Sequence, residues 1–236
     1  MRSKQSGFTL VEIAIVLVII GLLLGGVLKG QELINSAKVK NIATDFRNIP
    51  LFIYGYQDKF RALPGDDVGV AAHVAGGTKA TTAGQTQGNA VIEGAWDSVI
   101  VTDESYLFWQ HVRLAGLAAG PTATADTNYI PKNADGGALG IASNSNTTPY
   151  IAGMTGTYLA CSTSILGKYA KQLDTMIDDG CPNTGSVRAV PAHPAGTTTA
   201  NVAAGLVPIA AGAVCPITAA GPTMDDSTSY TVCMTM

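Results

Sequence analysis

The apolar run over residues 8–28 constrains the fold of this chain more than any other feature of the sequence. As an α-helix rising about 1.5 Å per residue, it would cover roughly the 30 Å hydrocarbon core of a bilayer. The run contains one charge, Glu12, and a carboxylate near hydrocarbon costs about 2 to 4 kcal/mol unless it is paired or protonated. The segment is therefore long enough to span a membrane, and its glutamate needs a compensating partner.

The residues that flank this run argue against a cleaved secretory signal. Such a signal has a basic start, an apolar region of about 7 to 15 residues and a small-residue cleavage site after it. Arg2 and Lys4 provide the basic start, but the run is longer and reaches Lys29 without an A-x-A pattern. A plain membrane anchor explains the length and the basic, cytoplasm-facing start, but it leaves Glu12 unexplained.

The stretch K-Q-S-G-F-T-L-V-E, residues 4–12, resembles the class III leader of type IV pilins and of type II secretion pseudopilins. The resemblance implies that a prepilin peptidase cuts after Gly7, where the missing side chain leaves the backbone accessible. Residues 1–7 would be removed and Phe8 would become an N-methylated first residue. In this family the glutamate five residues after the cut pairs with the N-terminal amine of a neighbouring subunit, which would compensate Glu12.

The resemblance implies a structural subunit and not an enzyme. Its partners would be identical or related pilin subunits, the prepilin peptidase and an inner-membrane assembly platform. The precursor would cross the bacterial inner membrane once, with its head in the periplasm, and then join an extracellular or periplasmic filament. A type IV pilus used for adhesion, motility or DNA uptake is the first hypothesis, and a type II secretion pseudopilus is the alternative. A membrane-anchored periplasmic binding or enzymatic domain is the alternative of another class.

The helix predicted from the apolar run continues well beyond it. Apolar residues recur at helical spacing as Ile42, Phe46, Ile49, Ile53, Tyr56 and Phe60. We therefore expect one helix over residues 8–60, with a bend near Pro50, which lacks a backbone N–H. The expected divisions are a leader (1–7), a transmembrane or filament-core helix (8–28), an amphipathic continuation (29–62) and a globular head (63–236).

The head is predicted to be α+β and pilin-like, with an antiparallel sheet packed on the long helix. Apolar periodicity predicts shorter helices over residues 103–117 and 164–177. Turn-bounded segments predict strands over residues 129–131, 138–142, 150–154, 157–161 and 186–190. Residues 66–95 and 191–236 show no sustained pattern, so no elements are assigned to them. The Leu-Pro-Gly-Asp exit at residues 63–66 and the 103–117 segment also resemble one branch of pilin-like proteins.

The residue types that carry chemistry are scattered. His73, His111 and His193 form no H-x-x-x-H pattern and no C-x-x-C occurs, so the sequence predicts no catalytic residue and no cofactor. Asp174, Asp178 and Asp179 are a weak calcium candidate, since such a group is more often a solvated helix end, although major pseudopilins bind calcium in their heads. The formal net charge of −3 predicts no strongly basic surface and no clear nucleic-acid site.

All four cysteines, Cys161, Cys181, Cys215 and Cys233, follow the membrane segment. In an oxidising periplasm they would form two disulfides, each worth about 2 to 4 kcal/mol, with three possible connectivities. We favour Cys161 with Cys181 and Cys215 with Cys233, because each pair is about 20 residues apart and the second would fasten the tail. The resemblance supports the second pair, since many pilins close a C-terminal loop this way. Free buried cysteines are the alternative.

Overall fold

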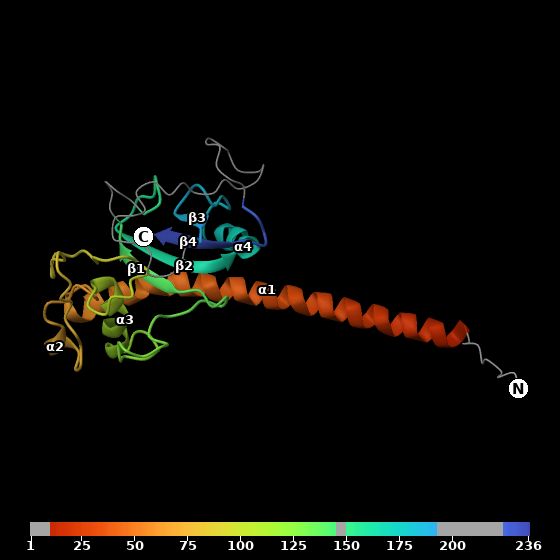
Figure 1. Cartoon of the computed structure of the whole chain (residues 1–236), viewed down its shortest axis with the longest axis horizontal. Coiled ribbons are helices and arrows are strands. Elements are labelled where there is room, and N and C mark those ends of the chain that lie inside the picture. The colour runs from red at the N-terminus through yellow and green to blue at the C-terminus, as the bar shows by residue number, and fades with distance from the viewer. Residues whose placement is uncertain (1–9, 145–149, 193–223) are drawn as a thin grey trace, which may run out of the picture. The chain divides into compact units, whose positions relative to one another are not determined.

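The computed structural model describes residues 10–144, 150–192 and 224–236. It confirms the predicted α+β, pilin-like class: a long N-terminal helix is followed by short helices and an antiparallel four-stranded sheet (Figure 1). In chain order the elements are α1 (Leu10–Phe60), α2 (Val70–His73), α3 (Glu104–Leu114), β1 (Leu139–Ser143), β2 (Tyr158–Leu166), α4 (Gly167–Ile177), β3 (Val187–Pro191) and β4 (Ser229–Thr235).

The chain divides into two compact units, one ending at Lys38 and the other beginning at Val39. The described part of the first unit belongs to α1, and its apolar side chains are exposed, from 46% at Ile20 to 86% at Leu10. Within the described residues, α1 is the one helix long and apolar enough to cross a membrane. This exposed apolar surface suggests membrane anchoring of a precursor, as the sequence predicted.

In the second unit, α1 buries one stripe of side chains in the core of the head. The predicted stripe is confirmed from Ile42 to Tyr56, with Phe60 only partly buried, and α1 continues through Pro50 without interruption. Burial on both sides of the proline holds the backbone helical where its missing N–H would otherwise favour a break. The buried residues of α1 are Val39, Ile42, Ala43, Phe46, Ile49, Ile53 and Tyr56.

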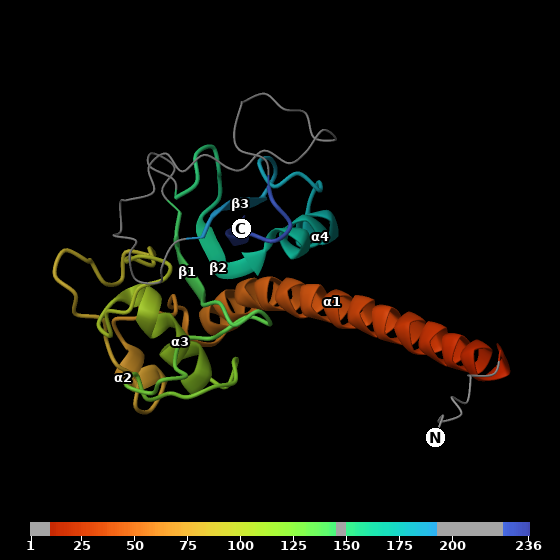
Figure 2. The ribbon, with the colours of Figure 1, turned by 45° about the vertical axis from the view of Figure 1, so that its right-hand side comes forward.

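The sheet has the order β1-β2-β4-β3, and all its pairs are antiparallel. Figure 2 shows the sheet above the last turns of α1, with α4 beside the strands. Successive residues alternate between the two faces. Ala160 and Val232 pack in the core cluster that contains the α1 stripe, whereas Cys161 and Cys233 pack in a second cluster with Trp96. The sheet is therefore covered on both faces.

Three predicted strands are confirmed as β1, β2 and β3, but the other strand assignments were wrong. Residues 129–131 and 150–154 form no strand: residues 129–131 are irregular, and in 150–154 Ile151 makes only an isolated bridge before a turn at Gly153. The missed strand is β4, which lies in the tail to which no element was assigned. It is placed between β2 and β3, so its structure depends on partners distant in sequence. The short helix α2 was also missed, in the 66–95 connection.

Candidate functional site

The segment expected to carry processing and assembly lies at the start of α1. Glu12 is the acidic residue of the first turn of α1, among exposed apolar side chains. Gly7 and Phe8, the predicted cleavage and methylation residues, lie outside the described residues, as do Arg2 and Lys4. What the described helix provides is a long apolar surface with a carboxylate near its beginning. Such a surface is suited to lipid or to packing against other helices, where polar groups fix the register.

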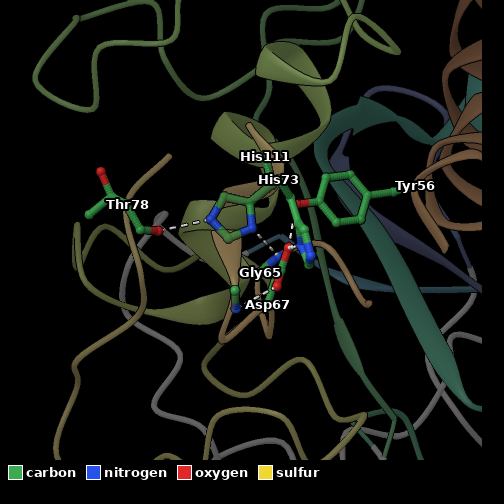
Figure 3. A network of polar contacts seen from close by, with 7 residues as sticks. Tyr56, Gly65, Asp67, His73, Thr78 and His111 are labelled. Carbon is green, nitrogen blue, oxygen red and sulfur yellow. Dashed lines mark hydrogen bonds and ion pairs between the residues drawn. The ribbon is translucent and has the colours of Figure 1, made fainter. Parts of the chain in front are cut away.

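A buried carboxylate, Asp67, is the centre of a polar network in the head (Figure 3). The Tyr56 hydroxyl donates to Oδ2 of Asp67 at 2.7 Å, and Nδ1 of His73 lies 2.6 Å from the same oxygen. The Gly69 N–H donates to Oδ1 at 2.8 Å. Burial raises the pKa of Tyr56, and its hydrogen bond to Asp67 and the charge there raise it further. The network therefore joins the end of α1 to the following turn and to α2.

His111 is fully buried on α3 and joins two loops in the same region (Figure 3). Its Nδ1 accepts from the Gly65 N–H at 2.9 Å, so Nε2 carries the proton and donates to the Thr78 carbonyl at 2.8 Å. Burial lowers the pKa of His111, although the Thr78 contact and the charge of Asp67 oppose the shift. The imidazole is therefore neutral at physiological pH and has both nitrogens engaged. Its contacts are those of a residue that holds loops in place.

Sequence reasoning named the histidines individually but missed this network. The structure brings His73 and His111 to the same region, where the rings of His73 and Phe60 are stacked with centroids 5.3 Å apart. His193 lies outside the described residues. The central residue, Asp67, was not singled out from the sequence. Its place two residues after the Pro-Gly turn was the available signal.

Of the three aspartates of the calcium candidate, Asp178 and Asp179 hold the turn between α4 and β3, and Asp174 lies on α4. Asp178 accepts from the N–H groups of Ser186 and Val187, at 2.5 and 3.0 Å. Asp179 accepts from the Cys181 N–H at 2.8 Å. Asp174 is 1% exposed, and burial, followed by the charge of Asp179, raises its pKa to about 7. Within the described ranges no three acidic, histidine or cysteine side chains are grouped as metal ligands would be, so the calcium interpretation is not supported.

The predicted cysteine pairing was wrong. A disulfide joins Cys161 to Cys233, which excludes both Cys161 with Cys181 and Cys215 with Cys233. The physical reason is the sheet register, because β4 lies beside β2 and places Cys233 directly opposite Cys161. Cys181 is also disulfide-bonded, and Cys215 lies outside the described residues. Proximity along the sequence was a poor guide, since strand pairing brings distant residues together.

Comparison with known proteins identifies the N-terminal segment. Residues 2–28 match the family described as the prokaryotic N-terminal methylation motif. No curated protein and no solved structure matches the chain. The motif implies processing by a prepilin peptidase and assembly into a pilin polymer. With residues 2–28 carrying this motif and α1 continuing as a long apolar helix into a pilin-like α+β head, the chain fits the precursors of the type IV pilin and pseudopilin family.

Proposed function

We propose that the chain is the structural subunit of a type IV pilus, made as an inner-membrane precursor, cleaved after Gly7 and methylated at Phe8. The observation that carries this proposal is the surface of α1. Its apolar side chains before Lys29 are exposed and surround one carboxylate, whereas one face of its turns from Val39 onward is buried in the head. A helix with these two halves can anchor a subunit and then pack against other copies without unfolding its head.

Assembly follows from the properties of α1. Arg2 and Lys4 stay on the cytoplasmic side before cleavage, and the head is exported. When mature subunits leave the bilayer, lipid contacts are replaced by protein contacts, so the hydrophobic effect contributes little to association. Close helix packing and pairing of Glu12 with the new amino terminus of Phe8 in a neighbour then set the register. The four functional segments are accordingly 1–7, 8–28, 29–62 and 63–236.

The head favours a surface fibre over a type II secretion pseudopilus, which is the second candidate. The Cys161–Cys233 disulfide fixes the C-terminal strand β4 to β2. A fibre outside the cell must resist proteolysis and shear, and a covalently fastened C-terminal strand reduces local opening. Adhesion, motility or DNA uptake would be the role of such a fibre. A membrane-anchored binding or enzymatic domain would need neither the methylation motif nor Glu12.

Mass spectrometry of the N-terminal peptide tests the proposal, with sheared surface material and the cell envelope measured separately. A pilus subunit is expected in the sheared fraction, beginning at methylated Phe8. A processed protein found only in the envelope would favour the pseudopilin. An intact Met1 start in both fractions would contradict assembly of either kind.

A further inference from the structure

Residues 85–93, called here the 85–93 loop, have no regular secondary structure, and carboxylates accept several of their backbone hydrogen bonds. Asp66 accepts from the N–H groups of Gly88 and Ala90, the latter at 2.7 Å. Oε2 of Glu104 accepts from the Glu93 N–H at 2.9 Å. Backbone groups in an irregular segment must find such partners when they leave water. Two acidic side chains from different elements therefore hold Gly88, Ala90 and Glu93, whereas Ile92 of the same loop is buried in the core and bonds to Ser143.

These two side chains are themselves buried. Asp66 is 3% exposed on the turn after α1, and Glu104 is 0% exposed in the first turn of α3. The other oxygen of Glu104, Oε1, is buried and has no hydrogen-bond partner in the part of the chain that the structure describes. A buried ionised oxygen without a donor is costly, whereas a protonated one can donate to a neighbouring carboxylate.

The charged groups that face Glu104 are also acidic. They are Asp66 on the turn after α1 and Glu93 in the 85–93 loop. Burial raises the pKa of Glu104 to about 8, the Glu93 N–H lowers it, and the charges of Asp66 and Glu93 raise it further. The amino-terminal end of α3 favours the ionised form, but it is a smaller effect than burial. Near neutral pH, Glu104 therefore carries a proton.

We propose that Asp66 and Glu104 form a proton-linked carboxyl pair that holds the 85–93 loop closed on the head. With the proton on Glu104, the pair bears one negative charge. The N–H groups of the loop then donate hydrogen bonds to both side chains. Loss of the proton leaves two buried carboxylates facing each other beside Glu93. Residues 86–91, which precede the buried Ile92, then open and expose Glu104 to water.

Opening of the loop changes a cleft in the head. The cleft has a volume of about 460 Å³, and its walls include Arg61, Leu63, Asp66, Gly88 and Ala90. Gly88 and Ala90 belong to the loop, so release of their hydrogen bonds to Asp66 removes one wall. The pair therefore couples the proton concentration outside the membrane to the shape of this surface.

The direction of the pH effect follows from proton linkage. In the open state Glu104 is in water and its pKa returns to the ordinary value of 4.5, whereas in the closed state it is about 8. Between these values the closed state holds one proton more than the open state. The opening equilibrium constant therefore rises about tenfold for each pH unit from about 5 to 8 and levels off above that range.

Amide hydrogen exchange of the full-length protein in detergent micelles tests this pair. Protection factors of Gly88 and Ala90, corrected for the intrinsic exchange rate, are measured from pH 5.5 to 9. In the unmodified protein they are expected to fall about tenfold per pH unit and to level off near pH 8. In Glu104→Gln, which is neutral at every pH, they are expected not to change with pH. Asp58→Asn removes an exposed carboxylate of α1 and should behave like the unmodified protein.

A second measurement does not depend on any variant. Carbon-13 detection of the Glu104 carboxyl group in the unmodified protein should show titration near pH 8. Titration of this group near its ordinary value, or an undiminished pH dependence of protection in Glu104→Gln, would overturn the proposal. If Glu104→Gln does not fold, the carboxyl titration alone decides the outcome.

Discussion

Cys161 on β2 and Cys233 on β4 lie directly opposite each other on adjacent antiparallel strands, and a disulfide joins them across 72 residues of sequence. Both are fully buried, in the cluster that covers the sheet face away from the α1 stripe. The bond ties the C-terminal strand into the middle of the sheet, between β2 and β3. It therefore closes the long segment that includes α4, β3 and the residues that precede β4.

Removal of this disulfide should destabilise the head strongly. In the chain-entropy description, a bond that closes a loop of this length contributes about 4 kcal/mol. The double variant Cys161→Ala and Cys233→Ala leaves no unpaired thiol at the site and should lose about that free energy of unfolding, measured by denaturant titration. Peptide mapping without reduction should first show Cys161 linked to Cys233 in the unmodified protein. A loss below about 1 kcal/mol would contradict the predicted contribution.

Single truncations on α1 should cost much more stability on its buried face than on its exposed face. Ile53 is 1% exposed in the core of the head, whereas Leu51, two residues earlier, is 63% exposed. Ile53→Ala should reduce the free energy of unfolding by about 2 to 5 kcal/mol, because it leaves a cavity in the core of the head. Leu51→Ala is the matched control and should change it by less than about 0.5 kcal/mol. Equal losses in the two variants would mean that the helix is rotated from the orientation described.

Gly65 should tolerate no side chain. Its φ is +93°, and a Cβ there would lie 2.5 Å from the backbone oxygen of Glu104. Gly76 has a similar φ of +82°, but a Cβ there would meet no other atom within 4 Å, so this position isolates the conformational cost. Gly76→Ala should cost about 1 kcal/mol, and Gly65→Ala about 3 kcal/mol or more. Thermal unfolding of both variants checks the difference, and similar costs would contradict the close approach.

Asp174 should make the stability of the head fall as the pH rises. Its pKa in the folded protein is about 7, above the ordinary 3.8, so the folded state binds the proton more tightly than the unfolded chain. The stability from this proton is complete below about pH 4 and is lost as the pH rises through 7, by at most about 1.4 kcal/mol per pH unit. Asp174→Asn should remove this part of the slope.

Denaturant titrations between pH 4 and 8 measure the effect of Asp174. Subtracting the stability curve of Asp174→Asn from that of the unmodified protein isolates the contribution of Asp174, because the contribution of Glu104 is present in both curves. Asp58→Asn, at an exposed position of α1, is the control and should leave the slope unchanged. Parallel curves for the unmodified protein and Asp174→Asn would show that Asp174 is ionised in the folded protein.

The sequence predicted the parts of the fold that depend on local periodicity. The α1 stripe, α3 and α4 follow from apolar spacing, and β1 to β3 from short turn-bounded segments. It did not predict β4, because the strand is specified by β2 and β3 on either side. The periodicity of α3 indicated one apolar face, yet the polar residues Glu104 and Arg113 are also buried. Their burial is set by loops packed around the helix, which helical spacing does not report.

The candidate sites also divide into those set by local sequence and those set by contacts between distant segments. The residues 2–28 motif is local, so the N-terminal segment could be identified from the sequence. The Asp67 network, the Asp66–Glu104 pair and the Cys161–Cys233 bond each join residues from separate elements. Their partners are fixed by how loops and strands meet in three dimensions. No spacing rule along the chain identifies them.

Replacement of Glu12 should separate membrane insertion from filament assembly. Glu12→Leu and Glu12→Ala make the apolar segment less polar, so both variants should insert and be processed as the unmodified protein is. Assembly should fall about tenfold or more, because the amino terminus of the neighbouring subunit loses its partner. The measurement is the amount of the protein in sheared surface material relative to the envelope.

The matched control for Glu12 is another glutamate of α1, Glu32, whose side chain is 69% exposed and forms an ion pair with Lys29 at 2.6 Å. Glu32→Gln removes a charge from the same helix at an exposed position, where an ion pair contributes little, so filament yield should change little. If filament yield falls equally in the Glu12 variants and in Glu32→Gln, negative charge anywhere on α1 is required. Normal filaments from either Glu12 variant would contradict subunit pairing through this residue, because packing of the apolar surface alone would then be enough to set the register.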